Sequence, residues 1–511
     1  MKSAMNDNYH LPELTRRQTL QLAAGGITVL SLGNSGCATR NPTEFEPAPD
    51  WLLKLTQSES GGRSYAPRVE GAVPRDLQGT LYRNGPGLFE RAGYRKQHLL
   101  DGDGLVQRLH FDQGQVHYRN AFVQTPKYLA EQEAQRYLYS TWTTRRAGGP
   151  LRNLGGGPMA PQAGVTVYPV GNKVYALDEA NPIFEVDPVT LGTLGSRVMG
   201  EKLPNVKAHT KFDPITGDWL LAGQDFGRTS SLHAVAYDRH GRLTQQHKVT
   251  DQPLVYWHDF MITQQYFVYV LHPCELEPFG MLAGMRSVVN SLRWRPEKGN
   301  RIVLLPRTGG TPTFFEASGA FMWHALNAYE KGDELIADIV AYDNPDHFIG
   351  EDPLLHTLMS GRMGNAQEAG KLRRYIINTR TGTLKEEVLD SGNHEFPFVD
   401  PRAVAQEHSV GYYAWSGIGT MQTGLKRLDM KTGQAQVFDF GPGTHVGEPV
   451  FVNRPSGQID DGWLISQCLD GTSGTTFFAL FDAAAITNGP VAKIWLDHSV
   501  PLSFHGWWQA A

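Results

Sequence analysis

A repeated tight-turn signature, set between short runs of strand-forming residues, limits the fold of this chain more than any other feature. Each copy places an Asp or Asn four residues before a Gly, at 213–217, 378–382 and 429–433. The Asp or Asn side chain can hydrogen-bond the backbone two residues on, and the Gly adopts a positive φ, so each copy closes a hairpin. The β-rich runs are 173–178, 219–222, 232–237, 266–271, 301–305, 334–342, 372–378, 412–415, 436–440 and 476–481.

Hairpins repeated in this way, without long helical periodicity, favour an all-β fold of the propeller type, and a pair of β-sandwiches is the alternative. The 55 Gly and 31 Pro residues agree with many tight turns. Residues 128–139, rich in Leu, Ala, Glu and Gln, form the one helical pattern, and we interpret them as an insert. Residues 51–511 therefore read as a single β domain. The formal charge of −5, with no basic stripe, gives no indication of nucleic-acid binding.

The N-terminal segment resembles a targeting signal rather than part of the fold. Arg16-Arg17 follows the twin-arginine pattern, and the apolar, uncharged run 20–32 behind it is too short to span a bilayer. Cys37 is a candidate for lipid attachment. We predict an export signal at 1–37, a linker at 38–50, and a bacterial protein that is periplasmic or membrane-anchored. An amphipathic start with a chance Arg-Arg pair is the alternative.

Four of the 18 histidines stand out because of their neighbours: His209, His258, His324 and His505. Most histidines are solvated or hydrogen-bonded side chains and need no special role. The separations of 49, 66 and 181 residues exceed any single local motif and cannot by themselves place the four together. In a propeller, however, they could occupy one inner-strand position on each of four blades, all facing the central axis.

Nine segments, in this order along the chain, resemble signature segments of the carotenoid cleavage oxygenase family. The match runs from about Trp51 to the end of the chain. Any one segment is a weak signal, but this many in one order make the resemblance specific. The segments are 82–87, 100–104, 207–217, 258–260, 292–299, 327–330, 395–402, 447–451 and 504–506.

The resemblance implies a seven-bladed β-propeller with loop and helical inserts over one face and Fe(II) on its axis. Carried over position by position, the ligands are the four histidines above, and Glu179, Glu395 and Glu448 stand behind three of them. Each Glu would accept the other ring N–H and hold the ring in orientation. Four neutral imidazoles suit Fe(II) and leave up to two of six positions for O2 and a substrate or water.

Two positions depart from the family pattern. The family commonly has Asn-Thr-Asn upstream of the first Glu, where this chain has Gly164-Val165-Thr166. The family Thr crowds one coordination position, and Val165, or Thr166 if the register slips, could do the same. Asp178 stands before Glu179, where the stilbene-cleaving branch typically has a Lys that meets a phenol. The apocarotenoid branch typically has an aromatic residue there. Asp178 matches neither branch, so it argues against a phenolic stilbene and does not by itself indicate a carotenoid.

The resemblance further implies a hydrophobic small-molecule substrate and O2 as partners. We expect cleavage of one C=C bond of a carotenoid or apocarotenoid into two carbonyl products, and a lignin-derived stilbene or phenylpropenoid is the second choice. A non-oxidative isomerase or a carotenoid-binding member of the same fold stays open. The apolar segment 279–285 resembles part of a hydrophobic face that contacts membranes in the family, and a buried loop is the alternative.

Overall fold

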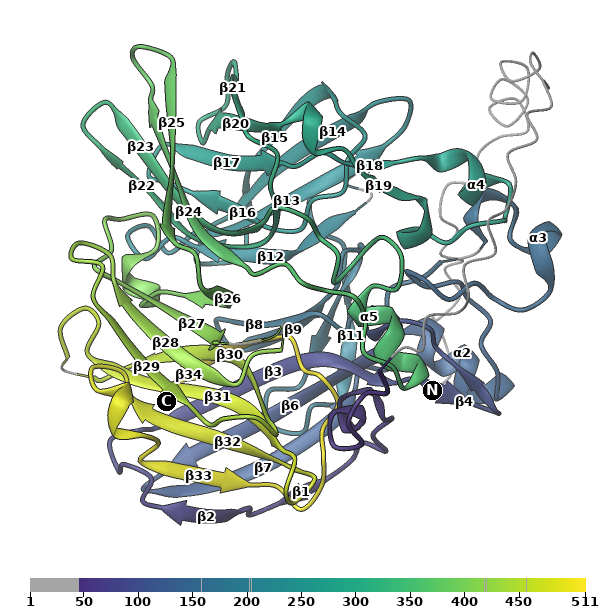
Figure 1. The fold of residues 1–511 in the computed structure, drawn as a ribbon, viewed down its shortest axis with the longest axis vertical. Helices are drawn as coiled ribbons and strands as arrows, with labels where there is room; N and C mark the ends of the chain where they lie inside the picture. The colour runs from purple at the N-terminus through teal and green to yellow at the C-terminus, as the bar shows by residue number, and fades with distance from the viewer. Residues whose placement is uncertain are drawn as a thin grey trace. The chain divides into compact units, whose positions relative to one another are not determined.

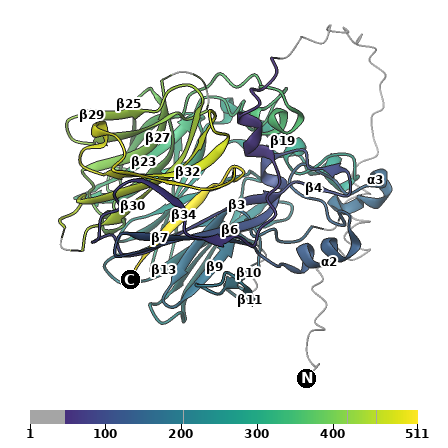
Figure 2. The same cartoon turned by 90° about the horizontal axis from the view of Figure 1, so that it is seen from below.

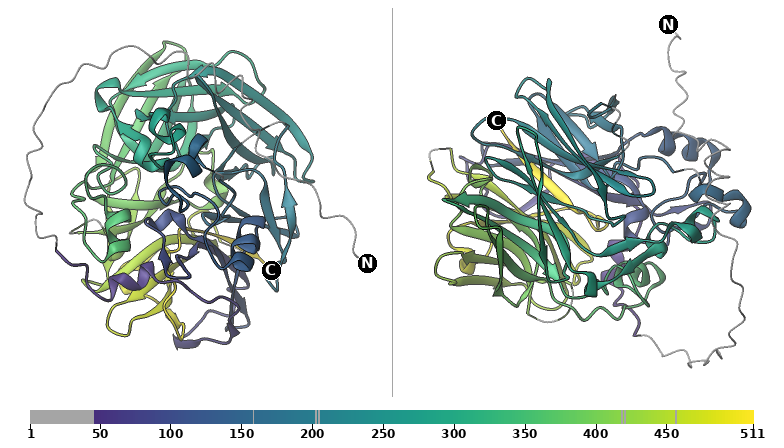
Figure 3. Two further views of the ribbon diagram at one scale, coloured as in Figure 1. Left: turned by 90° about the vertical axis from the view of Figure 1, so that its right-hand side faces the viewer. Right: turned by 90° about the horizontal axis from the view of Figure 1, so that it is seen from above.

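The computed structural model describes residues 46–511 except 158, 202, 204, 418, 420 and 456. The predicted export signal and Cys37 lie outside the described residues. The described unit begins at Glu46 and so includes the end of the stretch interpreted as a linker. Within it, seven sheets of four or five strands stand around a common centre (Figure 1, Figure 3).

Four blades come from the first half of the ring, each given from its innermost to its outermost strand. The first contains β34 (His505–Ala510), β3 (Gly79–Leu88), β6 (Asp103–Asp112), β7 (Gln115–Phe122) and β1 (Ser64–Tyr65). The second contains β8 (Thr166–Val170), β9 (Lys173–Leu177), β10 (Ile183–Val186) and β11 (Thr193–Arg197). The third contains β12 (Val206–Phe212), β13 (Trp219–Phe226), β14 (Ser230–Tyr237) and β15 (Leu243–Gln252). The fourth contains β16 (Phe260–Ile262), β17 (Tyr266–Leu271), β20 (Asn300–Pro306) and β21 (Thr313–Ala317).

Three further blades complete the ring. The fifth contains β22 (Phe321–Lys331), β23 (Glu334–Tyr342), β24 (Lys371–Asn378) and β25 (Thr383–Asp390). The sixth contains β26 (Asn393–Phe398), β27 (Val410–Ser416), β28 (Gly424–Asp429) and β29 (Ala435–Asp439). The seventh contains β30 (Thr444–Asn453), β31 (Gly462–Asp470), β32 (Thr475–Asp482), β33 (Ala492–Trp495) and β2 (Arg68–Gly71). Two small ribbons lie outside the blades, β4 (Glu90–Arg91) with β5 (Tyr94–Arg95), and β18 (Cys274–Leu276) with β19 (Leu292–Trp294).

The two ends of the described chain close the ring together. The C-terminal strand β34 pairs with β3, and the N-terminal strand β2 pairs with β33, so two adjacent blades each contain strands from both ends. The innermost strands contact one another around the axis, and β30 meets β34 where the ring closes. The predicted seven-bladed propeller is confirmed, and the four histidines come from the inner strands of four different blades or from the residues just before them.

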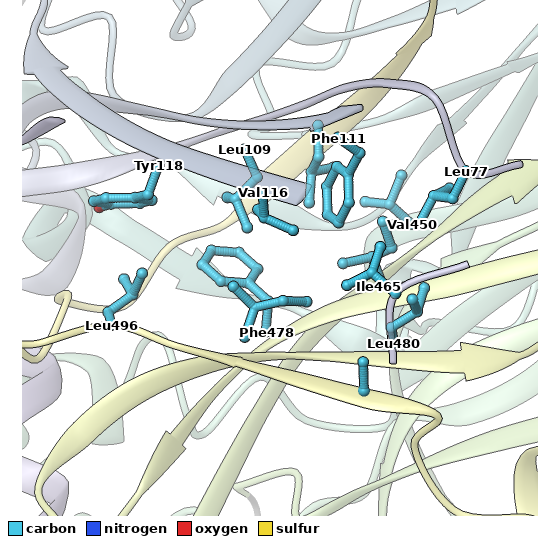
Figure 4. Packing of buried hydrophobic residues seen from close by; sticks show 14 of the residues in the cluster. Leu77, Leu109, Phe111, Val116, Tyr118, Val450, Ile465, Phe478, Leu480 and Leu496 are labelled. Atoms are coloured by element: carbon cyan, nitrogen blue, oxygen red, sulfur yellow. The ribbon is translucent and has the colours of Figure 1, made fainter. Parts of the chain in front are cut away.

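The core lies between neighbouring blades. In Figure 4, Leu109 and Val116 of the first blade face Ile465 and Phe478 of the seventh. Strand β7 alternates buried and partly exposed residues, whereas β31 is buried along nearly all its length. Alternation is expected where one face of a sheet is covered, and continuous burial where neighbouring blades cover both faces.

Short helices gather on one side of the propeller (Figure 1, Figure 2). The predicted helical insert is confirmed as α2 (Pro126–Ala134), which begins where Thr125 accepts the backbone N–H of Tyr128 and ends at Gln135 with positive φ. The sequence pattern missed α3 (Gly149–Arg152), α4 (Pro278–Leu282) and α5 (Leu354–Thr357), because four or five residues are too few to show helical periodicity.

Two further points concern cysteines and membranes. The sequence leaves open whether Cys274 and Cys468 form a disulfide, and in the structure both are free and buried. In the described part of the chain, no helix is both long and apolar enough to cross a membrane.

Candidate metal centre

The inner strands break their regular pairing where the predicted site residues lie. The register of β12 shifts between Val206 and Thr210, around His209, and that of β22 shifts between Met322 and Ala325, around His324. Similar breaks follow Glu395 in β26 and enclose Glu448 in β30. A bulge turns side chains out of the normal alternation and is a frequent device beside active sites. These irregularities therefore let side chains of pleated strands turn toward the axis.

The structure brings the four predicted histidines together. One ligand atom from each of His209, His258, His324 and His505 lies within 4.8 Å of all the others, and every one of the four rings is buried. The Nε2 atoms form two close pairs, with 3.1 Å between His209 and His258 and 3.1 Å between His324 and His505. The ring nitrogens that meet at the axis are thus the Nε2 atoms.

A carboxylate stands behind three of the four rings. The Nδ1 atoms of His258 and His324 lie 2.5 Å from Glu179 and Glu395, and Nδ1 of His505 lies 2.8 Å from Glu448. Because a carboxylate accepts, each Nδ1 carries the proton and each Nε2 presents a lone pair to the axis. Within the described residues, His209 has no such carboxylate partner, as the family comparison of the three Glu positions predicts.

Each of the three carboxylates is held in turn by different groups. Glu179 accepts from Lys207 Nζ at 3.1 Å and from the Tyr256 hydroxyl at 3.1 Å. Glu395 accepts from the Tyr342 hydroxyl at 3.0 Å and from the N–H of Phe396 at 2.6 Å.

Glu448 accepts the N–H of Gly506 at 2.7 Å and lies 3.7 Å from the guanidinium of Arg83. Arg83 is fully buried and also donates to the backbone oxygens of Glu448 and Phe504. Sequence reasoning named neither Lys207 nor Arg83 as a site residue. Both lie inside segments that carry the family resemblance, which was the one signal available.

Burial and mutual repulsion favour the neutral form of three of the four rings, those of His209, His258 and His505. Burial, followed by the neighbouring histidines, lowers the pKa of His209 and of His505 well below the ordinary value. Burial also lowers the pKa of His258, against the opposing effect of Glu179. Burial opposes the charged form of His324 as well, but Glu395, together with Asp259 and Glu448, outweighs it and raises the pKa of that ring.

The donor set fits one metal ion. The Nε2 lone pairs of His258, His324 and His505 face one another and Nε2 of His209 within 4.8 Å, and a cation between the four nitrogens would relieve the repulsion of these lone pairs. A metal–imidazole bond is about 2.1 Å long, so a single ion suits nitrogens this close together. Neutral imidazoles suit iron, zinc, copper and nickel, and three nearby carboxylates balance the charge of a divalent ion.

Three further residues that the sequence singled out, Asp178, Thr166 and Val165, have other partners. The Asp178 carboxylate accepts the backbone N–H groups of Gln162 and Ala163, so it holds a loop and is buried. The Thr166 hydroxyl donates to the Ala208 carbonyl at 2.7 Å. Val165 packs instead against an apolar cluster that contains Phe504, next to His505.

Space and aromatic rings lie on two sides of the four imidazoles. A cavity of about 90 Å³ touches His209, His324 and His505, which is room for a small molecule beside the ring nitrogens. On the side of His258, the Trp323 ring lies 5.0 Å away, and the Phe348 ring lies 4.6 Å from that of Trp323. The side of the centre next to His258 is therefore apolar, whereas the cavity also contacts Lys211 and Asp259.

Comparison with known proteins agrees with this geometry. A family model described as Retinal pigment epithelial membrane protein matches residues 56–510. An apocarotenoid-15,15′-oxygenase of Synechocystis sp. is 29% identical over 491 residues, which are 92% of this chain and 98% of that protein. An isoeugenol monooxygenase of Pseudomonas putida is 26% identical over 471 residues, which are 86% of this chain and 94% of that protein. A solved structure of a Synechocystis apocarotenoid oxygenase variant superposes with a TM-score of 0.85 at 28% identity, over 92% of this chain and 100% of that one.

The propeller and its four-histidine centre place the protein among metal-dependent propeller enzymes. The chain belongs to the Retinal pigment epithelial membrane protein family, which is the carotenoid cleavage oxygenase family, and its four-histidine site is of the kind typical of the Fe(II) oxygenases in that family.

Proposed function

We propose that this protein is an Fe(II)-dependent dioxygenase that cleaves one C=C bond of an apocarotenoid. In that reaction the double bond is broken, each of its two carbons gains one oxygen atom, and O2 is the oxidant. The observation that carries the proposal is the meeting of four Nε2 atoms within 4.8 Å, with three of the rings held by carboxylates.

The residues of the chain would hold the metal, keep the imidazole rings in orientation and exclude water from the site. Bound at His209, His258, His324 and His505, iron would supply the redox chemistry with O2. The three carboxylates hold the ring orientations before substrate arrives, which is the preorganisation that such centres need. Trp323, which contacts His258, provides an apolar wall that favours a conjugated hydrocarbon chain over water.

The relatives support a hydrophobic, unsaturated substrate but differ in its identity. The relative from Synechocystis is named for an apocarotenoid, and that from Pseudomonas putida for isoeugenol, a phenylpropenoid. Higher identity and nearly full coverage of both chains favour the apocarotenoid. A phenylpropenoid or stilbene substrate, or isomerisation without O2, remains an outcome of the experiment below.

The test is aerobic incubation of the iron-loaded protein with a panel of apocarotenals, stilbenes and isoeugenol, with mass detection of the products under ¹⁸O2. We expect two carbonyl products from an apocarotenal, with oxygen from O2. Cleavage confined to isoeugenol or stilbenes would replace the substrate. Products without O2-derived oxygen would remove the oxygenase assignment.

We further propose that the protein is exported and contacts a membrane peripherally. The twin-arginine pattern at 1–37 supports export. In the 279–285 segment the side chains of Phe279 and Met285 are 78% and 52% exposed, and Leu151 on the neighbouring α3 is 83% exposed. Large apolar side chains gathered on one surface are typical of membrane contact. Flotation with lipid vesicles should fall for Phe279→Glu and not for Lys385→Glu, a control on an exposed strand.

A further inference from the structure

A second cavity lies among the inserts and not on the propeller axis. It has a volume of about 540 Å³ and is lined by His98, Thr143, Trp294, Phe348 and residues of the 344–356 segment. We call it the Phe348 pocket. Its volume is in the usual range for a small-molecule site. Phe348 links it to the metal centre, because its ring contacts that of Trp323 at 4.6 Å and Trp323 contacts His258 at 5.0 Å.

Three of the residues that line this pocket carry a buried polar atom without a partner. They are Nε2 of His98, Nε1 of Trp294 and the hydroxyl of Thr143. Nδ1 of His98 accepts the backbone N–H of Leu100 at 3.0 Å. Burial lowers the pKa of His98 to about 4, so the ring is neutral near pH 7 and its one N–H is on Nε2.

All three atoms can donate a hydrogen bond, and two of them can only donate. A neutral imidazole N–H and an indole N–H have no acceptor capacity, whereas a hydroxyl can donate or accept. Each buried donor without a partner in a folded protein needs an explanation, and three around one cavity indicate an acceptor from outside the chain. A carbonyl oxygen has two lone pairs and no proton, so it matches this set better than a hydroxyl does, which must also donate.

We propose that the Phe348 pocket binds the carbonyl oxygen at one end of the substrate, and so selects aldehyde- or ketone-bearing chains over pure hydrocarbons. This inference rests on the proposed function, because it takes the occupant of the pocket to be the substrate of the metal centre. The apolar part of the molecule would then extend past Phe348 and Trp323 toward His258.

The experiment compares β-apo-8′-carotenal with the matching hydrocarbon, in which a methyl group replaces the aldehyde. The double variant Trp294→Phe/Thr143→Val removes two donors, keeps an aromatic ring at 294 and the side-chain volume at 143, and leaves His98 in place to cap its turn. Trp463→Phe is the matched control, because Trp463 Nε1 is also buried without a partner but lies in a cluster between the first and seventh blades.

We expect the wild type to prefer the aldehyde in kcat/KM, and the double variant to lose about 3- to 10-fold of that preference, mainly through KM. A carbonyl oxygen accepts two hydrogen bonds, His98 still supplies one in the variant, and the one that is lost usually has this value. Iron content of the double variant and the aldehyde-to-hydrocarbon ratio of Trp463→Phe should not change. An unchanged ratio in a folded, iron-loaded double variant would overturn the inference.

Failure of the proposed function gives a different result, because no member of the substrate panel would then be cleaved by the wild type. In that case calorimetry with β-ionone, a ketone that carries a ring, tests whether the pocket binds a carbonyl group. Binding that weakens in the double variant and not in Trp463→Phe supports a carbonyl site. Equal binding by all three proteins, or no binding, overturns it.

Discussion

The metal centre and the Phe348 pocket differ in the kind of partner that each of them lacks. At the axis, four ring nitrogens meet within 4.8 Å, and at least three of them present lone pairs, so this set of acceptors suits a cation. In the Phe348 pocket, the N–H groups of His98 and Trp294 and the hydroxyl of Thr143 have no partner, so the chain presents donors and needs an acceptor oxygen. Buried polar groups are normally paired. Whether the missing partner is a cation or a hydrogen-bond acceptor therefore indicates the chemistry of the ligand.

The two regions also differ in how firmly their groups are held. His209 and His324 lie at register breaks of inner strands that pair with the next strand of the blade on both sides of the break. The polar residues of the pocket lie at the end of a two-stranded ribbon, in a loop and before a short turn of helix. Sites on regular elements are more rigid than sites on loops, so the centre suits a metal and the pocket suits an adaptable organic group.

The largest effect should follow from loss of one lone pair at the axis. His324→Ala should lower iron content and reduce cleavage by more than about 100-fold, because removal of a partner one step further out already costs 10- to 100-fold. Metal analysis and turnover on an apocarotenal measure both. His240→Ala, at an exposed position, is the control. Full activity in metal-free His324→Ala would break the assignment of the axis as a cation site.

A smaller effect should follow when the ring is kept and only its carboxylate is neutralised. Glu395→Gln keeps the volume but removes the charge that faces His324 Nδ1 at 2.5 Å. We expect iron affinity or kcat to fall about 10- to 100-fold. Exposed Glu334→Gln should change neither. If the two variants behave alike, the carboxylates do not orient the rings, and the metal centre is not more firmly held than the Phe348 pocket.

Substitution of Lys207 tests the role of the positive charge that pairs with Glu179, behind His258. Lys207→Met leaves Glu179 with Tyr256 and His258 but without a cation, in a pair whose side chains are 4% and 6% exposed. Breaking such a buried pair costs about 3–5 kcal/mol of folding stability, and we expect iron affinity to fall about tenfold. Thermal unfolding and iron titration measure these effects. The exposed pair of Lys173 with Glu185 offers Lys173→Met as control, and equal losses in the two variants would remove the special role of Lys207.

The sequence predicted the blades because their turns are local. Asp213 accepts the N–H groups of Ile215 and Thr216, and Gly217 has a φ of +76°, as the turn signature requires. The same pattern holds at Asn378 and Asp429. The number of blades came from the family resemblance, because hairpin turns do not show how many sheets share one axis.

The site was predictable only as far as the resemblance reached. Spacing alone could not join His324 to His505, which are 181 residues apart and have their Nε2 atoms 3.1 Å apart. Arg83 and Glu448 are 365 residues apart, and no local pattern relates them. The unpaired state of His98 and Trp294 is a property of the folded chain, because it depends on every neighbour that fails to reach those atoms. Residues that meet only when the ring of blades closes can therefore not be predicted as partners from the sequence alone.

The smallest expected quantity is the coupling between the two regions. Glu395 pairs with His324, Tyr342 and Phe396, and none of these lines the Phe348 pocket. Effects of substitutions that share no partner usually add to within about 0.3–0.5 kcal/mol. A double-mutant cycle of Glu395→Gln with Trp294→Phe should therefore show a coupling of no more than about twofold in kcat/KM on an apocarotenal. A larger coupling would mean that Phe348 and Trp323 transmit structural changes between the Phe348 pocket and the metal centre. The pocket and the centre would then act as one site and not as two.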